Sequence, residues 1–207
     1  MSSPSDLEVA LAALEAELLR LQAPLVHHWQ PGAEPGAVTG QLATCGAEAL
    51  PDLLAWFGWH DGTGVSATTP PGAPWLSDDT CLFGVWHLPT LGQAAVLHHA
   101  ALALEDEAGV IEALGTGWYK DGWFPVLVAL DGWLVCVDTI GTAGPVGSLF
   151  VWDTHAANDP FDLRPWYPSL TGMVAAMVAA YRSGRITPTQ GYIELEDLPP
   201  ESRPLAY

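Results

Sequence analysis

The stretch from residue 118 to residue 153 constrains the fold more than any other part of the chain. It reads WYKDGWFPVLVALDGWLVCVDTIGTAGPVGSLFVWD, and turn-forming residues separate three short apolar runs: Phe124–Ala129, Trp133–Asp138 and Ser148–Asp153. Short runs of Val, Phe and Trp bounded by turn formers are typical of strands. Because Asp131-Gly132 supplies the positive φ of a tight hairpin, the first two strands are predicted to pair antiparallel. The third follows a Gly/Pro-rich loop, so the stretch predicts a three-stranded meander.

These strands are expected to be covered on both faces. Apolar residues occupy both odd- and even-numbered positions in Pro125–Leu130 and Trp133–Val137. In a strand of a sheet with one solvent-exposed face, apolar and polar residues alternate instead. Helices must supply the covers, and four are predicted: Ser5–Gln22, Leu50–Trp59, Thr90–Glu107 and Ser169–Ser183. Helices followed by strands and then a helix favour an α+β fold over alternating βαβ units. The sequence therefore predicts a bent antiparallel sheet packed with N-terminal and C-terminal helices.

The first helix carries both a start signal and an apolar stripe. Ser5 and Glu8 have the spacing of a capping box, in which each side chain satisfies a backbone N–H of the other residue. Leucines then recur at spacings of four and three: Leu7, Leu11, Leu14, Leu18, Leu21 and Leu25. Such a stripe lies along one helix face. We expect it to pack on the protein's own core, with pairing to a second copy as the alternative.

Weaker signals fill the rest of the chain. A short helix is possible over residues 35–46, the helix that begins near Leu50 is expected to stop at Gly62, and Cys81–His87 can be a strand. Thr63–Asp79 contains no periodicity and is predicted to be a long surface loop, a kind of loop that is often functional. We expect one domain over residues 1–185 and an acidic, proline-containing tail over 186–207.

The charge of the chain narrows its possible partners. Six basic residues against 24 acidic ones give a net charge of −18, which disfavours direct binding to nucleic acid or to an anionic membrane surface and favours a basic protein partner. Solubility is the alternative reason for such a charge. The N-terminus MSSPSDLEVA lacks a basic and apolar leader, and no window has the roughly 18 apolar residues of a membrane span. A cytoplasmic protein is expected.

Catalytic, cofactor and metal motifs are not found in the sequence. Residues 141–147 lack the spacing of a phosphate-binding loop, no Gly-Xaa-Ser-Xaa-Gly is present, and the three cysteines and seven histidines show no CxxC or HExxH pattern. We therefore expect no metal site, no cofactor and no catalytic residues. One alternative stays open, because Asp138, Asp153 and His155 lie at predicted strand ends and could converge into an acid/base or metal site. Strand-end acids are more often turn formers.

Aromatic residues suggest where a partner could bind. Most of the ten Trp residues are expected in the core, but Trp118, Tyr119 and Trp123 bracket a polar turn at 120–122 and are placed near the surface. Long loops beside a rigid sheet concentrate binding residues. The predicted partner-binding residues are Trp118, Tyr119, Asp121, Trp123, Asp138, Asp153 and His155.

Several short motifs occur in a characteristic order: LPDLLAWFGWHDG at 50–62, WFPV at 123–126, LVCVD at 134–138, the glycines of 144–147, VWDTH at 151–155 and PSL at 168–170. The spacing and order of these segments over roughly residues 50–184 resemble the SUKH superfamily of the Smi/Knr type. The resemblance implies an α+β domain with a strongly bent antiparallel sheet. It also implies a role like that of bacterial immunity proteins or fungal cell-wall regulators, a family without a known catalytic set.

The leading functional hypothesis is a non-enzymatic binding domain, an immunity protein that covers the basic active site of a toxin, such as a nuclease. The positive charge of that active site would attract the acidic surface of this protein, which would speed association and make the two surfaces electrostatically complementary. An intracellular adaptor of the same fold is the second hypothesis. An enzyme using Asp138, Asp153 and His155 is the third. The sequence gives no indication of oligomeric state.

Overall fold

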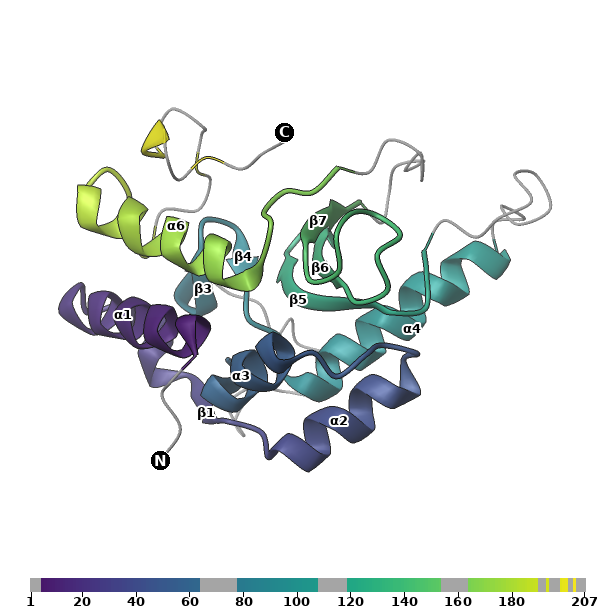
Figure 1. Ribbon diagram of the computed structural model, residues 1–207. Coiled ribbons are helices and arrows are strands. Elements are labelled where there is room, and N and C mark those ends of the chain that lie inside the picture. Colours follow the sequence, from purple (N-terminus) through teal and green to yellow (C-terminus); the bar gives the residue numbers. More distant parts are fainter. Residues whose placement is uncertain are drawn as a thin grey trace.

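The computed structural model describes residues 5–63, 78–107, 119–153 and 164–189, together with 193, 198–200 and 203. Its elements confirm the α+β class, with two antiparallel sheets, and Figure 1 shows the larger one strongly curled. In chain order they are α1 (Asp6–Arg20), η1 (Pro24–His27), β1 (Trp29–Pro31), α2 (Pro35–Thr44), α3 (Pro51–Trp59), β2 (His60–Thr63), η2 (Asp78–Thr80), β3 (Cys81–Phe83), β4 (Trp86–His87), α4 (Leu91–Glu107), β5 (Trp123–Ala129), β6 (Leu134–Asp138), β7 (Leu149–Trp152) and α6 (Leu170–Ser183).

The predicted meander forms one end of the five-stranded sheet, whose order is β3-β4-β5-β6-β7. In the β5–β6 hairpin, Gly132 N–H donates to Ala129 O over 3.0 Å and Ala129 N–H donates to Trp133 O over 2.8 Å. Gly132 has a φ of 91°, the left-handed conformation that closes a three-residue hairpin loop. The prediction that Asp131-Gly132 supplies the positive φ of a hairpin turn is therefore confirmed.

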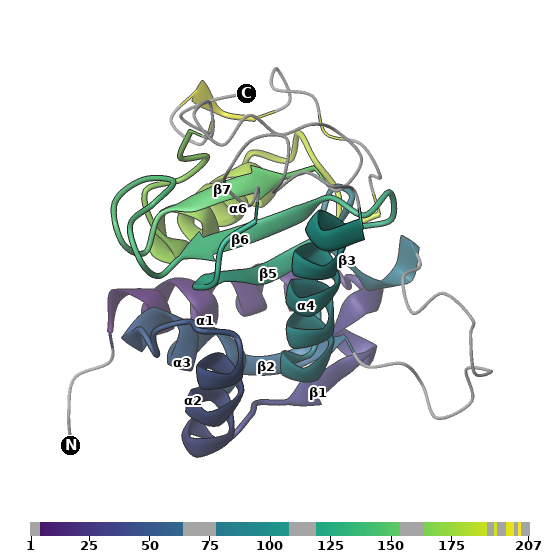
Figure 2. The ribbon, with the colours of Figure 1, turned by 90° about the vertical axis from the view of Figure 1, so that its right-hand side faces the viewer.

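Helices cover both faces of the sheet, as predicted from the apolar residues at both odd and even strand positions. Figure 2 shows α4 against one face, with α1 and α6 beyond the other. Ala101 of α4 packs with Val128, Cys136 and Phe150 in one apolar cluster. The larger cluster takes the opposite strand positions together with the helices α1, α3 and α6. The strands β5 and β6 are consequently buried along their whole length.

The helix α1 packs inside the domain through its leucine stripe. Leu7, Leu11, Leu14 and Leu18 are at most 2% exposed, and the capping box of Ser5 and Glu8 is present. The expectation that the stripe joins the protein's own core is confirmed.

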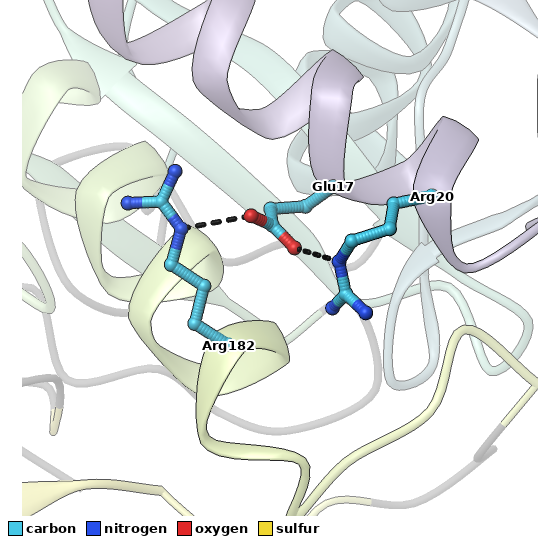
Figure 3. A network of polar contacts seen from close by, with 3 residues as sticks. All are labelled: Glu17, Arg20 and Arg182. Atoms are coloured by element: carbon cyan, nitrogen blue, oxygen red, sulfur yellow. Dashed lines mark hydrogen bonds and ion pairs between the residues drawn. The ribbon is translucent and has the colours of Figure 1, made fainter.

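An ion-pair network ties α1 to α6 beside this stripe. Arg20 Nε donates to Glu17 over 2.7 Å, and Arg182 Nε donates to the other Glu17 oxygen over 2.8 Å (Figure 3). The two arginines, Arg182 first, lower the pKa of Glu17. One carboxylate therefore links the first and the last helix of the described chain.

Two local expectations differ from the structure. The predicted strand Cys81–His87 is a hairpin, with Gly84 at a φ of 59° between β3 and β4. The segment expected to end a helix at Gly62 forms β2 instead, which pairs with the unpredicted β1. Gly62 has a φ of 77°, and a Cβ there would overlap the Thr90 backbone. Its requirement for glycine thus comes from a close chain approach and not from a helix cap.

The predicted tail contributes to the core where the structure describes it. Ile186 is 1% exposed and Leu198 is 5% exposed, and both belong to the large apolar cluster. Most of the predicted 63–79 loop, residues 64–77, lies outside the described residues.

Candidate functional site

Two aromatic residues expected at the surface belong to the core. Tyr119 is 2% exposed and Trp123 is 1% exposed, so the prediction of surface placement is wrong for both. Tyr119 Oη donates to Trp123 O over 2.8 Å, and the Trp123 ring packs on Phe150 with centroids 4.6 Å apart. The polar turn between them directs both rings under α4. Trp118 lies outside the described residues.

Asp138 is a buried loop anchor and does not form a contact surface. Its side chain is fully buried, and its carboxylate accepts backbone N–H bonds from Ile140 (3.0 Å), Gly141 (2.7 Å), Ala143 (2.5 Å) and Gly144 (3.2 Å). Because the side chain is buried and these donors occupy both oxygens, the structure gives no support to the predicted role of Asp138 in partner contact. The turn-forming alternative is the one observed.

The strand-end acids do not converge. Asp138 lies opposite Trp123, whereas Trp152, the residue before Asp153, lies opposite Leu134 at the other end of β6. Four residues of strand, or about 13 Å, separate those ends. The suggested acid/base pairing of Asp138 with Asp153 is therefore wrong, and His155 lies outside the described residues. Asp121 is exposed and Asp153 is half-buried, at opposite ends of the meander.

A groove of ≈ 700 Å³ opens between α1, α3 and the segment Gly32–Pro35. We call it the α1–α3 groove. Leu11, Leu54, Ala55 and Trp59 give it an apolar floor, of which Leu11 is buried and the other three are half-buried. Among the described residues that line it, the charged side chains are all acidic: Glu8, Glu15 and Glu34.

Helical spacing builds two walls of the groove. Glu8, Ala12 and Glu15 recur at intervals of four and three along α1, and Leu54 and Gly58 lie four positions apart along α3. Residues at such spacings share one helix face. The third wall depends on Gly32, where a Cβ would overlap the Gly58 carbonyl. This close approach seats the 32–35 segment against the end of α3.

Two of the three carboxylates of the groove, those of Glu8 and Glu15, are held by neighbouring groups, whereas Glu34 makes no capping hydrogen bond. Glu8 accepts the Ser5 backbone N–H in the capping box, and that bond, with a smaller contribution from the Ser5 hydroxyl, lowers the pKa of Glu8. Glu15 accepts the Trp59 indole N–H over 2.9 Å. Glu34 is the residue that precedes α2, where the helix dipole favours negative charge. The groove therefore presents ordered negative charge beside an apolar floor.

Aromatic rings flank the groove beside Trp59. Trp29 stacks on His60 with centroids 4.2 Å apart and meets Trp59 edge-on at 5.5 Å. His60 Nε2 lies 3.8 Å from Glu15, and His60 Nδ1 lies 3.2 Å from Gln30 O. Desolvation lowers the pKa of His60, so the ring is neutral near pH 7. This packing fixes Trp59 and Glu15 in place.

The chemistry of this arrangement is that of recognition. The apolar floor and the carboxylates of the groove can bind a ligand that carries both an apolar face and positive charge. Within the part of the chain that the structure describes, no group of three His, Cys, Asp or Glu side chains is placed to hold a metal ion. None of the helices described is long and apolar enough to cross a membrane.

Sequence reasoning missed the groove, although one signal was present. Glu8, Ala12 and Glu15 each follow a leucine of the stripe and therefore form a second row of side chains beside it on α1. The other two walls come from residues 32–35 and 51–59, and nothing local in the sequence predicts that these segments meet α1.

No protein-family model matches this chain, and no curated protein gives a significant match.

Proposed function

We propose that this protein is a non-enzymatic binding domain whose α1–α3 groove receives a basic segment of a partner protein. The observation that carries the proposal is the groove itself: an apolar floor bordered by Glu8, Glu15 and Glu34, in a chain with a net charge of −18. Apolar burial supplies affinity, and charge complementarity supplies specificity and a fast association rate.

We propose further that the partner is a bacterial toxin and that this protein is its cytoplasmic immunity protein. A nuclease toxin must carry positive charge to hold phosphate groups, so an acidic inhibitor matches its active-site cleft. The resemblance to the SUKH superfamily supports the same role. The net negative charge alone could also be explained by a need for solubility. Solubility does not explain why three carboxylates lie beside a half-buried apolar floor.

An intracellular adaptor that uses the same groove is the second candidate. The gene neighbourhood separates the two: a large secreted toxin encoded beside this protein supports immunity, and an unrelated operon supports the adaptor.

The enzymatic alternative has lost its main support, because Asp138 is fully buried and its carboxylate already accepts four backbone N–H groups.

The groove can be filled by one substitution. Gly58 is an exposed glycine of α3 that lines the groove, and a Cβ there would meet only Ala33 O, at 3.9 Å. Gly58→Leu therefore places a side chain in the groove without a backbone clash. Gly40→Leu is the matched control, because Gly40 is an exposed glycine of α2 with open space around its Cβ position.

If a toxin gene lies beside this one, the test is growth protection in a bacterial host that expresses the toxic domain of that gene. The parent protein and Gly40→Leu are expected to protect the host, and Gly58→Leu is expected to fail. Both variants should melt at or above the parent temperature, because leucine favours a helix over glycine by up to about 1 kcal/mol. Full protection by a folded Gly58→Leu variant would show that the groove is not the contact site.

A further inference from the structure

We propose that the α1–α3 groove is shaped for an α-helix of the partner, one that carries two basic residues seven positions apart beside an apolar stripe. This inference rests on the proposed function and specifies its ligand. It follows from the spacing of the groove's carboxylates, the shape of its walls and the small residues that line it.

The spacing of two carboxylates matches a helix. Glu8 and Glu15 lie seven residues apart on α1 and line the same groove, which places them about 10.5 Å apart along the helix axis. Basic residues at positions i and i+7 of a second helix repeat at that same distance. On an extended strand, residues on one face recur at about 6.7 and 13 Å. A helical ligand can therefore pair both carboxylates, and a strand can pair only one well.

The shape of the groove also favours a helix. Its α1 wall runs from Ser5 to Glu15 and its α3 wall from Pro51 to Trp59, lengths of about 15 and 12 Å. A third helix fits into the seam between two helices when side chains at the contact allow axes 8–10 Å apart. Ala12, Ala55 and Gly58 line the seam, and their small size permits that approach.

The two carboxylates are prepared for cationic partners in different ways. Glu8 is exposed, and the capping box holds it against the start of α1. Glu15 uses Oε2 to accept the Trp59 indole N–H, and its Oε1 makes no hydrogen bond within the described residues. Since both side chains are already ordered, an ion pair with a Lys or Arg costs less side-chain entropy than it would on a free surface.

A second copy of this chain does not supply the ligand. The chain has six basic residues, and no two of them lie seven positions apart in the sequence. Of these, Arg20 of α1 and Arg182 of α6 are already paired with Glu17. The ligand must therefore come from another protein.

Three synthetic peptides of equal composition test the inference. The first is an Ala/Leu-rich helix with lysines at i and i+7. The second has the same lysines at i and i+5, which places them on different sides of the helix. The third keeps the i, i+7 spacing but carries a central proline that breaks the helix, and a proline at one end of the other two equalises composition. Circular dichroism checks that the first two peptides are equally helical.

The seven-spaced helix is expected to bind at least about tenfold more tightly than the other two peptides when dissociation constants are measured by calorimetry at low salt. That preference should disappear in the variant Glu8→Gln/Glu15→Gln, which retains the capping box and the acceptor for Trp59 because glutamine can perform both roles. Glu34→Gln is the matched control, because it removes a charge from the groove but leaves the seven-residue pair intact.

Two results would overturn the inference. If all three peptides bind equally and Gly58→Leu abolishes that binding, the groove recognises an unstructured basic segment; the helical ligand is then wrong and the proposed function stands. If the seven-spaced helix does not bind at all, the helical ligand is wrong, and the growth assay alone decides the proposed function.

Discussion

At the scale of single residues, Asp138 shows how a functional pattern and a structural one can coincide in sequence. An acid at a strand end is compatible with a contact or catalytic role, and the same acid can organise the next loop. Its four backbone N–H donors come from residues 140–144, so its structural role is local in sequence. The missing information was burial, which depends on tertiary packing and cannot be read from the residue types around Asp138.

This role predicts the stability of an Asp138→Asn variant. Asparagine keeps one acceptor oxygen and places an amide donor against the loop N–H groups, which leaves buried donors without partners. The free energy of unfolding should fall by about 1–3 kcal/mol. Asp121→Asn, at an exposed position, should change it by no more than about 0.5 kcal/mol. Urea unfolding of both variants measures the difference, and equal stability of the two would contradict the anchoring role.

At the scale of elements, local signals predicted most of the fold. The helices α1, α3, α4 and α6 were predicted from caps and periodicity, and β5 to β7 from apolar runs and the Asp131-Gly132 turn. The β1–β2 pair was missed because Trp29 pairs with Thr63, a partner 34 positions away with no hairpin turn between them. The groove was missed for the same reason, since its three walls meet only through tertiary packing. Surface placement of Trp123 was wrong because α4 covers that face.

Double burial of the meander predicts a sharp contrast between two aspartate substitutions. Val135 is completely buried in β6, whereas Leu130 is 57% exposed at the hairpin turn. Val135→Asp places an unpaired charge in the core at a cost of several kcal/mol, comparable with the whole stability of a domain, and should abolish the cooperative thermal transition. Leu130→Asp should melt near the parent temperature. A cooperative, near-parent melt of Val135→Asp would show that β6 is not buried on both faces.

At the scale of the whole molecule, net charge and buried histidines make stability depend on pH. Desolvation is the main cause that lowers the pKa values of His60 and His98 below 6.5. His98 is fully buried, its Nδ1 lies 2.9 Å from Trp123 O, and its Nε2 has no hydrogen-bond partner among the residues that the structure describes. Because the unfolded chain takes up these protons more readily than the folded chain, stability is highest above pH 6.5 and falls as the pH drops below it.

The pH effect predicts a difference between the parent and His98→Asn. The parent melting temperature should fall between pH 7.5 and pH 5.5, a range above the lowered pKa values of Glu8 and Glu17 and therefore dominated by histidine. In His98→Asn the fall should be smaller, because asparagine can donate to Trp123 O without accepting a proton. Calorimetric scans at both pH values provide the test. An unchanged pH dependence would assign it to other groups.

The charge of the whole molecule and the contacts of the groove should influence binding kinetics in separable ways. A net charge of −18 acts at long range, so association with a basic partner should slow as salt rises, whereas groove contacts act after docking and set the dissociation rate. Asp121→Asn/Asp153→Asn, which removes two charges away from the groove, should reduce the association rate modestly and leave dissociation unchanged. Glu8→Gln/Glu15→Gln removes the same charge from the groove and should also speed dissociation, by roughly tenfold for a loss near 1.4 kcal/mol.

Stopped-flow measurements at low and high salt with the toxic domain separate the two effects. An association rate indifferent to salt would refute the electrostatic contribution, and equal dissociation rates for the two double variants would place the contact surface elsewhere on the domain.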